Sequence, residues 1–430
     1  MCSLMKNTDY FKNKKVTIIG LARSGLSCAN LLYDLGAMVS VSDNQENEST
    51  CLYKTKLKSK NIKIELGKHT EEFIKNRDLV VVSPGVSNTS LPVIWAKQSG
   101  IPVISEIELA WGLCPATVIA VTGTNGKTTV TTLIGNILEA KGERVFVCGN
   151  IGNPFCGELD KMKAGDFVAL EVSSFQLERI ETFKPKISVI LNFTCNHLDR
   201  YKDMQEYLQA KKRIFMNQDK NDYAVLNYHD PLVRELSKET KASVVYFSQD
   251  SDLNLNQSAT LTIGSILGID KKLCLDVFSK FKGIEHRLEH VAEINDIKFI
   301  NDSKATTVDS TAWALENISC PIVLIAGGRE KGNDYSVILD LVRQKVREVV
   351  LIGEAEKKIG DAFKGFLTIE KADTLEEAAK KAFYKARPGD CVLFSPMCKS
   401  FDMFSNYEER GEVFKKAVHN LVKDKVTNSY

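Results

Sequence analysis

The sequence of 430 residues lacks several features that would indicate particular classes of protein. No apolar stretch is long enough to cross a membrane, and the N-terminal segment MCSLMKNTDYFKNKK lacks the apolar core of a signal peptide. The eleven cysteines form no CxxC pair and no Cys/His cluster, which argues against a zinc site or a disulfide framework. The net charge is only +2, so we expect neither nucleic acid nor membrane insertion. Together these absences predict a cytoplasmic protein.

What is present is an ordinary globular composition, with 43% hydrophobic and 26% charged residues. Strand-like runs alternate with helical stretches nearly throughout, which predicts an α/β fold with parallel sheets covered by helices. We expect three domains, at residues 1–105, 106–283 and 284–430, each with several strands of its own. Within the second domain, the polar stretch at residues 249–257 is expected to be a loop.

The most informative motif is the loop GTNGKTT at residues 123–129, which follows the apolar run TVIAV and precedes a helical pattern. Glycines let backbone N–H groups close around phosphate, and the helix N-terminus adds positive potential. Lys127 can reach the outer phosphates, and the Thr128 hydroxyl can hold Mg²⁺. The loop is shorter than the common form, because Val121 stands where that form has its first glycine. These features predict binding of ATP or GTP.

A second glycine-containing turn, GLARSG at residues 20–25, follows the first predicted strand, and Asp43 ends the next one. This pattern is typical of a dinucleotide site, in which the acid binds a ribose. Ala22 replaces the glycine that normally approaches a pyrophosphate, and Arg23 adds a large charged side chain. A nucleotide-sugar site, an NAD site and a turn without a ligand therefore all remain open.

Further polar residues follow other predicted strands, at the edge where open parallel sheets bind ligands. Glu171 ends FVAL and is either an Mg²⁺ ligand or an acid favoured by a helix N-terminus. A lone histidine is usually structural, but His197 lies in a predicted loop with polar neighbours, where a metal or substrate role is reasonable. On the residues alone, Lys211 is a solvent-exposed helix lysine, and Ser83 belongs to a Pro-Gly turn.

The third domain begins near Arg287, which suits either a phosphate contact or a salt bridge at the domain junction. Asp302 could bind ribose hydroxyls, and Lys304 could pair with an anion. The turn GGREKG at residues 327–332 resembles a second anion-binding turn. Ser400 also follows a predicted strand, CVLF, so these groups share one edge of a sheet.

Taken together, the motifs resemble the Mur ligase family, ATP-dependent acid–amino acid ligases of peptidoglycan synthesis. Within that family they look like the D-glutamate-adding branch. The resemblance extends from Val16 to Phe414 and rests on GTNGKTT, GLARSGLS, VVSPG, GNIG, EVSSFQLE, NHLDRY, NDSKAT and SFDMFSNYEERG. It implies a Rossmann-like first domain that binds the UDP-muramoyl substrate, a P-loop ATPase-like central domain and a Rossmann-like C-terminal domain that closes on ATP and D-glutamate. The implied reaction adds D-glutamate to UDP-N-acetylmuramoyl-L-alanine through an acyl phosphate, and we expect a monomer.

The resemblance also assigns roles to individual residues. It implies ATP contacts from Gly123, Thr124, Asn125, Gly126, Lys127, Thr128, Thr129, Asn256, Arg287, Asp302 and Lys331. It implies UDP-substrate contacts from Arg23, Ser24, Asp43, Ser83, Asn150 and His197. It implies D-glutamate contacts from Lys304, Thr306, Ser400, Phe401 and Tyr407. Two Mg²⁺ sites would use Thr128, Glu171, His197 and a carbamylated Lys211, with catalysis by Lys127, His197 and Lys211.

Two departures from the family pattern concern ligand contacts. Ala259 stands where the family has a second asparagine three residues after Asn256, which affects the adenine side of the ATP site. Arg23 stands where related enzymes often have an apolar residue, which affects the uracil contact. Two other hypotheses use the same motifs: an NAD-dependent oxidoreductase built on the first domain, and a nucleotide-binding regulatory protein with an inactive ligase core.

Overall fold

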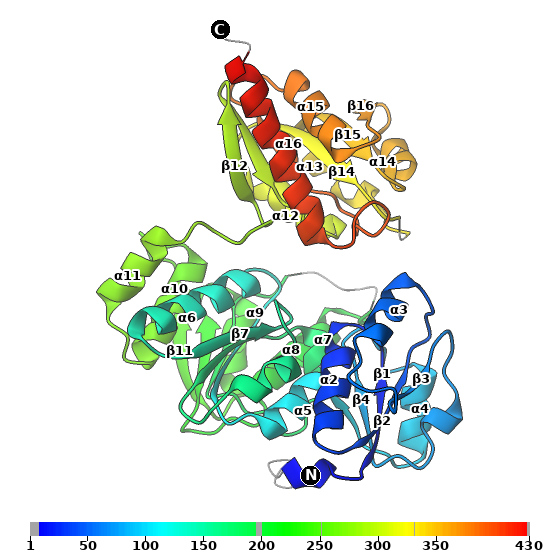
Figure 1. The fold of residues 1–430 in the computed structure, drawn as a ribbon. Helices are drawn as coiled ribbons and strands as arrows, with labels where there is room; N and C mark the ends of the chain where they lie inside the picture. The colour runs from blue at the N-terminus through cyan, green and yellow to red at the C-terminus, as the bar shows by residue number, and fades with distance from the viewer. Residues whose placement is uncertain (1–7, 195–199, 251, 331, 428–430) are drawn as a thin grey trace. The chain divides into compact units, whose positions relative to one another are not determined.

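The computed structural model describes residues 8–194, 200–250, 252–330 and 332–427. The chain divides into two compact units, Met1–Phe281 and Lys282–Tyr430 (Figure 1). The first unit contains two β-sheets and the second contains one. Among the described residues, no helix is long and apolar enough to cross a membrane.

The first sheet has five parallel strands in the order β3-β2-β1-β4-β5. β4 (LVVV) is buried throughout, and β1 (KVTII) is buried from Val16 to Ile19, as expected for central strands of a parallel sheet. The strands are β1 Lys15–Ile19, β2 Met38–Ser42, β3 Lys63–Glu65, β4 Leu79–Val82 and β5 Val103–Ser105. The helices are η1 Thr8–Phe11, α2 Arg23–Asp34, α3 Glu48–Thr55, η2 Glu71–Phe73 and α4 Leu91–Gln98.

The second sheet has six parallel strands in the order β11-β10-β9-β6-β8-β7. Helices α6, α10 and α11 pack together over one of its faces through Ile134, Ile137 and Ile263. The strands are β6 Thr117–Thr122, β7 Val145–Gly149, β8 Phe167–Glu171, β9 Ile187–Ile190, β10 Tyr223–Asn227 and β11 Ser243–Phe247. The helices are α6 Lys127–Lys141, η3 Phe155–Gly157, η4 Leu159–Lys161, α7 Ser174–Leu177, α8 Met204–Lys212, η5 Arg213–Phe215, α9 Pro231–Glu235, η6 Leu236–Lys238, α10 Leu255–Ile266 and α11 Lys271–Lys280.

The two sheets of the first unit share a hydrophobic core that runs from β1 through helix α5, Glu106–Leu113, to β8. Two carboxylates in the first turn of α5 are buried within this junction. Glu106 Oε1 accepts a hydrogen bond from Cys156 N at 2.7 Å. Glu108 Oε2 accepts from the backbone N–H groups of Glu181 and Phe183, each at 3.0 Å. Helix α5 therefore joins the first two domains by polar as well as apolar contacts.

The third sheet has the order β12-β13-β17-β14-β15-β16 and is parallel except for its first pair. The strands are β12 Glu289–Ile294, β13 Ile297–Asn301, β14 Ile322–Gly327, β15 Val346–Ile352, β16 Thr368–Lys371 and β17 Cys391–Phe394. The helices are α12 Val308–Asn317, η7 Ser336–Ile338, α13 Leu339–Lys345, α14 Glu356–Phe363, α15 Leu375–Lys385 and α16 Tyr407–Thr427. The α/β class and the three-domain architecture predicted from the sequence are confirmed.

Two local predictions were wrong. The sequence predicted parallel sheets, but in the third sheet β12 and β13 form an antiparallel hairpin whose turn residues, Asn295 and Asp296, both have positive φ. The stretch at residues 249–257 was predicted as a loop, but α10 begins at Leu255. Asn254 caps this helix by accepting from the N–H groups of Asn256 and Gln257, which a short capping residue does well.

Candidate functional site

The phosphate loop lies between β6 and α6, with Gly123–Gly126 in the turn and Lys127, Thr128 and Thr129 in the first helical turn. Gly123 and Gly126 have φ of 155° and 81°, a region that favours glycine. A β-carbon placed on Gly126 would lie 2.4 Å from Asn256 Oδ1, so the Asn256 side chain lies directly against the loop. The loop thus leaves backbone and helix N-terminus available to an anion.

Asn192, just after β9, closes the phosphate loop from the side. Its Oδ1 accepts from the N–H groups of Thr124 at 3.1 Å and Asn125 at 2.8 Å, and its Nδ2 donates to the Asn125 carbonyl at 3.1 Å. No motif in the sequence points to Asn192. Its position after a buried strand was the available signal.

Glu171, the last residue of β8, accepts hydrogen bonds from two other predicted site residues. Its Oε2 accepts from Thr128 Oγ1 at 2.8 Å, and its Oε1 accepts from Asn150 Nδ2 at 2.7 Å. Glu171 is only 2% exposed. The structure therefore brings together a hydroxyl and a carboxylate from the central domain beside the phosphate loop, along with an amide from the segment after β7.

Lys127 and Lys211 both donate to the carbonyl of Gly123, at 3.0 Å and 2.7 Å. Lys211 is 1% exposed, and its ammonium lies 4.6 Å from the ring centroid of Tyr207. The residue-based prediction of a solvent-exposed lysine was wrong, because α8 turns this position toward the phosphate loop. Burial, and next the charge of Lys127, lower the Lys211 pKa well below its usual value, and Glu171 opposes the shift.

The oxygen donors of Thr128 and Glu171 are the ligand type that Mg²⁺ prefers, and they lie within one hydrogen bond of each other. These residues fit a magnesium ion held beside the phosphate loop. An ammonium does not fit as a metal ligand, so Lys211 would qualify only after conversion to a carbamate. His197, the other predicted ligand, lies outside the described residues.

In the first domain, Ser83 and Asp43 both brace the glycine turn. Ser83 Oγ donates to the Gly20 carbonyl at 2.9 Å. Asp43 Oδ2 accepts from Leu21 N at 2.6 Å, and its Oδ1 accepts from Gln45 N at 2.8 Å. Asp43 therefore has a structural function in the turn, whatever ligand it also binds.

Arg23 and Ser24 occupy the first turn of α2, next to the glycine turn. Arg23 Nη1 donates to the carbonyl of Gly152, in the central-domain segment that also carries Asn150, at 3.3 Å. The unusual arginine therefore reaches across to the central domain.

In the second unit, Arg287 lies over Trp313, with 5.0 Å from its Cζ to the ring centroid. Its Nη1 is 3.8 Å from Asp302 Oδ1. Burial raises the Asp302 pKa to about 6, and the charge of Arg287 opposes that rise. Lys331, predicted beside ATP, lies outside the described residues.

The predicted D-glutamate residues come from two loops and one helix start. Lys304 Nζ lies 5.9 Å from the Tyr407 ring centroid, at the first residue of α16. Thr306 is partly exposed and Ser400 is buried, whereas Phe401 is 57% exposed. Lys304 and Tyr407 are therefore close neighbours, and Phe401 faces solvent within this unit.

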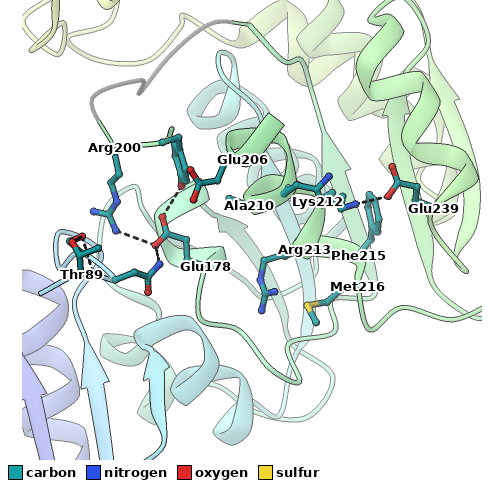
Figure 2. A pocket seen from close by; sticks show the side chains of 14 residues that line it. Thr89, Glu178, Arg200, Glu206, Ala210, Lys212, Arg213, Phe215, Met216 and Glu239 are labelled. Carbon is teal, nitrogen blue, oxygen red and sulfur yellow. Dashed lines mark hydrogen bonds and ion pairs between the residues drawn. The ribbon is translucent and has the colours of Figure 1, made fainter. Parts of the chain in front are cut away.

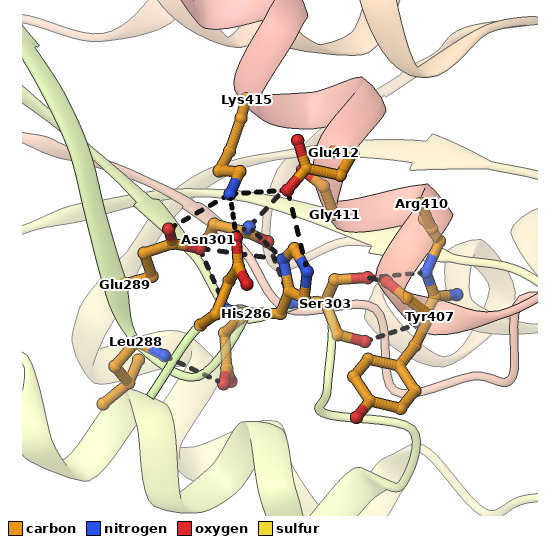
Figure 3. Close-up of polar contacts among 12 residues, drawn as sticks. His286, Leu288, Glu289, Asn301, Ser303, Tyr407, Arg410, Gly411, Glu412 and Lys415 are labelled. Atoms are coloured by element: carbon orange, nitrogen blue, oxygen red, sulfur yellow. Dashed lines mark hydrogen bonds and ion pairs between the residues drawn. The ribbon is translucent and has the colours of Figure 1, made fainter. Parts of the chain in front are cut away.

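A buried polar cluster, His286, Asn301, Ser303 and Arg410, supports these loops (Figure 3). Arg410 is 1% exposed and donates from Nε to Ser303 Oγ at 3.1 Å, from Nη2 to the Ser303 carbonyl at 2.8 Å and from Nη1 to the Cys398 carbonyl at 3.1 Å. The carbonyl of His286 accepts from Lys304 N at 3.0 Å. Sequence analysis missed Arg410, because nothing local shows that this helix residue is buried.

Three family models match the chain in sequence order. They are the MurD-like N-terminal domain of Mur ligases at residues 14–105, the Mur ligase middle domain at residues 121–282, and the Mur ligase glutamate ligase domain at residues 286–398.

Curated relatives match over nearly the whole chain. UDP-N-acetylmuramoylalanine--D-glutamate ligase of Geotalea uraniireducens is 42% identical, over 95% of this chain and 98% of the relative. The protein of the same name from Caldicellulosiruptor bescii is 41% identical, over 96% of this chain and 98% of the relative.

Solved structures show the same fold at low identity. UDP-N-acetylmuramate-alanine ligase MurC from Thermotoga maritima has a TM-score of 0.58 at 20% identity, covering 95% of this chain and 100% of that one. MurF ligase from Thermotoga maritima in complex with ADP has a TM-score of 0.57 at 16% identity, covering 98% and 100%. The family models and the relatives at about 40% identity confirm the resemblance seen in the sequence, and the chain belongs to the Mur ligase family.

Proposed function

We propose that this chain joins D-glutamate to UDP-N-acetylmuramoyl-L-alanine and converts ATP to ADP and phosphate, as a cytoplasmic monomer in peptidoglycan precursor synthesis. The observation that carries the proposal is the Thr128–Glu171 pair beside a closed phosphate loop. This pair occurs in a chain 42% identical to a protein named for the D-glutamate reaction. The geometry supports phosphoryl chemistry, and the relatives support the choice of amino acid.

The first step that this site supports is phosphoryl transfer. The carboxylate of the L-alanyl group attacks the γ-phosphorus, the bond to ADP breaks, and an acyl phosphate forms. Lys127 would reach the phosphates and neutralise their growing charge. Mg²⁺ bound by Thr128 and Glu171 would supply further charge neutralisation. Asn150 donates a hydrogen bond to Glu171 and would hold the Glu171 carboxylate in place.

The second step forms the amide bond. The amine of D-glutamate attacks the acyl carbonyl, phosphate leaves, and the amine loses a proton. We assign the D-glutamate carboxylates to Lys304 and to hydroxyl groups at Thr306 and Ser400, because ammonium and hydroxyl donors suit a dicarboxylate. The short distance between Lys304 and Tyr407 is consistent with one common site.

Lys211 has the properties that carbamylation requires. Its pKa is lowered by burial and by Lys127, so a larger fraction is the neutral amine that attacks CO₂. The reaction gives a carbamate and releases one proton. A carbamate on Lys211 would supply an anionic oxygen ligand for the second magnesium, which is expected near His197 and Lys211.

The first domain would bind the UDP part of the substrate at the glycine turn, near Ser24 and Asp43. Family membership replaces the oxidoreductase hypothesis, since it accounts for the glycine turn and the phosphate loop together. An inactive core would belong to the same family, so the retained residues speak against it. Lys127, Thr128 and Glu171 are all present, as an active ligase requires.

The decisive experiment offers several amino acids to the enzyme with UDP-N-acetylmuramoyl-L-alanine and ATP, and measures phosphate release and the product mass. D-glutamate should be preferred over L-alanine, L-glutamate and meso-diaminopimelate. Preference for any other amino acid would refute the assignment, and lack of ADP formation with all of them would refute ligase activity.

A further inference from the structure

Arg200 in the central domain holds a backbone loop of the first domain. Its Nη1 donates to the carbonyl of Pro84 at 3.1 Å, and its Nη2 donates to the carbonyl of Val86 at 3.3 Å. The side chain is only 18% exposed, and its Cζ lies 4.2 Å from the ring centroid of Phe175. A planar guanidinium with several donors is suited to binding two carbonyls while stacking on a ring.

The loop held by Arg200 packs directly on the glycine turn of the first domain. Val86 N donates to the Ser83 carbonyl at 3.0 Å, which closes the loop into a turn. Ser83 Oγ donates in turn to the Gly20 carbonyl at 2.9 Å. A β-carbon placed on Gly20 would lie 2.9 Å from Ser83 Cβ and 3.4 Å from Val86 Cγ2, so the two segments are in tight contact. Displacement of residues 83–86 would therefore displace the glycine turn.

Glu178, the residue after α7, fixes Arg200 from the other side. Its Oε2 is 3.3 Å from Arg200 Nη2 and accepts from Asn88 Nδ2 at 2.8 Å, while its Oε1 accepts from Tyr201 Oη at 2.8 Å. Asn88 belongs to the first domain, and Glu178 and Tyr201 belong to the central domain. The Glu178 carboxylate thus contacts Asn88 of the first domain and both Arg200 and Tyr201 of the central domain. The Glu178 side chain is only 10% exposed.

We propose that Arg200 is a positioning residue for the nucleotide-sugar substrate. It acts through residues 83–86, which it holds against the glycine turn, and so sets the position of the UDP site relative to the phosphate loop. The inference rests on the proposed function, which places the UDP moiety at that turn. Among the described residues, Arg200 contacts Pro84, Val86, Glu178 and Phe175, none of which is a proposed ATP residue, so ATP binding should be insensitive to Arg200.

The same region offers a matched control. A pocket of about 570 Å³ lies beside this junction, and none of its lining residues is a predicted site residue (Figure 2). Arg200 and Lys212 both line this pocket. Lys212 forms an ion pair with Glu239, and this pair lies away from Glu178. Both members of that pair belong to the central domain. Lys212→Met therefore removes a cation from the same pocket without affecting the loop at residues 83–86.

The test measures KM for UDP-N-acetylmuramoyl-L-alanine and for ATP in the full-length enzyme and in Arg200→Lys, Arg200→Met, Glu178→Gln and Lys212→Met. Calorimetric titration with the UDP substrate gives its affinity directly. Arg200 bonds the two carbonyls from two different nitrogens, whereas a lysine has a single nitrogen and lacks this fork geometry. For Arg200→Lys we therefore expect the KM for the UDP substrate to rise about tenfold, and for Glu178→Gln about threefold, with KM for ATP unchanged. The rise in KM for the UDP substrate should be larger in Arg200→Met than in Arg200→Lys. Lys212→Met should have the same KM values as the unmodified enzyme.

Three outcomes would overturn the inference: equal rises in both KM values, an unchanged UDP-substrate affinity in Arg200→Met, or an effect of Lys212→Met as large as that of Arg200→Lys. An unchanged KM for ATP also shows that a variant is folded around its phosphate loop. An enzyme that binds the UDP substrate but adds a different amino acid would refute the proposed function and leave the test of Arg200 intact.

Discussion

Glu106 provides a pH-dependent test of how the first two domains are joined. Its side chain is buried at the start of α5, and Oε1 accepts from Cys156 N at 2.7 Å. In the described part of the chain, its Oε2 has no hydrogen-bond partner. Burial raises the pKa of this carboxyl from 4.5 to about 7, although the hydrogen bond from Cys156 opposes the rise. The perturbation is Glu106→Gln, which keeps the acceptor for Cys156 and removes the ionisation.

The direction in which stability changes with pH follows from proton binding by Glu106. Between the unfolded pKa of 4.5 and the folded pKa of about 7, the folded chain binds the proton that the unfolded chain has released. The protonated carboxyl therefore stabilises the fold at low pH, and this stabilisation is lost as pH rises through the folded pKa. The full shift corresponds to about 3 kcal/mol, of which about 2 kcal/mol is lost between about pH 5.5 and about pH 8.5.

The assay is thermal unfolding of the enzyme and of Glu106→Gln at both pH values. The Tm of the unmodified enzyme relative to the variant should fall by about 4 °C or more between the two conditions, because a domain of this size shifts by about 2 °C per kcal/mol. Glu139→Gln, an exposed position on α6, should show no such change. If the Tm difference between the enzyme and Glu106→Gln is the same at both pH values, the argument from burial is wrong.

Three other predictions concern the candidate site and the stability of the second unit. Lys211→Ala should reduce kcat by about a hundredfold or more, since it removes the proposed metal ligand, and short carboxylates such as formate should restore part of it; near-normal activity without additives would contradict carbamylation. Asn192→Ala should raise KM for ATP about tenfold, because the Asn125 N–H loses its acceptor and the Asn125 carbonyl loses its donor, whereas Thr124 N keeps the Asn192 backbone carbonyl as acceptor; KM for the UDP substrate should stay unchanged, and an unchanged KM for ATP would show that the loop closes without the Asn192 side chain. Lys415→Met should lower the Tm of the second unit relative to the exposed control Lys416→Met. The Lys415 ammonium contacts Glu412 at 2.6 Å and Glu289 at 3.4 Å, so removing it leaves two carboxylates close together without a cation between them. Equal Tm values for the two variants would mean that the ion pairs of Lys415 contribute nothing measurable.

The sequence predicted the α/β class, the family and the contiguous motifs, because these depend on periodicity and local spacing. The phosphate loop at residues 123–129 and the strand-end position of Glu171 were found in this way. Their placement together, with Thr128 2.8 Å from Glu171, follows from the adjacency of β6 and β8 in the sheet. The binding roles of these residues remain predictions.

What the sequence could not reveal depends on tertiary burial. Lys211 has an ordinary lysine-rich sequence context, and only packing on Tyr207 shows that it is buried. Arg410 lies in a charged helix, and only the loops folded over it show that its guanidinium donates to carbonyls. The β12–β13 hairpin departs from the alternation of strands and helices, because its two strands follow each other directly across the two-residue turn Asn295-Asp296.

The two buried glutamates of α5 have a consequence for recombining parts of related ligases. Glu106 accepts a hydrogen bond from the backbone N–H of residue 156, and Glu108 accepts from those of residues 181–183, all of them in the central domain. A chimera that takes its first 113 residues from one ligase and the remainder from another would bury two carboxyl groups against unmatched backbone. A crossover before Glu106 keeps both glutamates with the donors they already contact, so it is the exchange point at which a hybrid enzyme should remain folded.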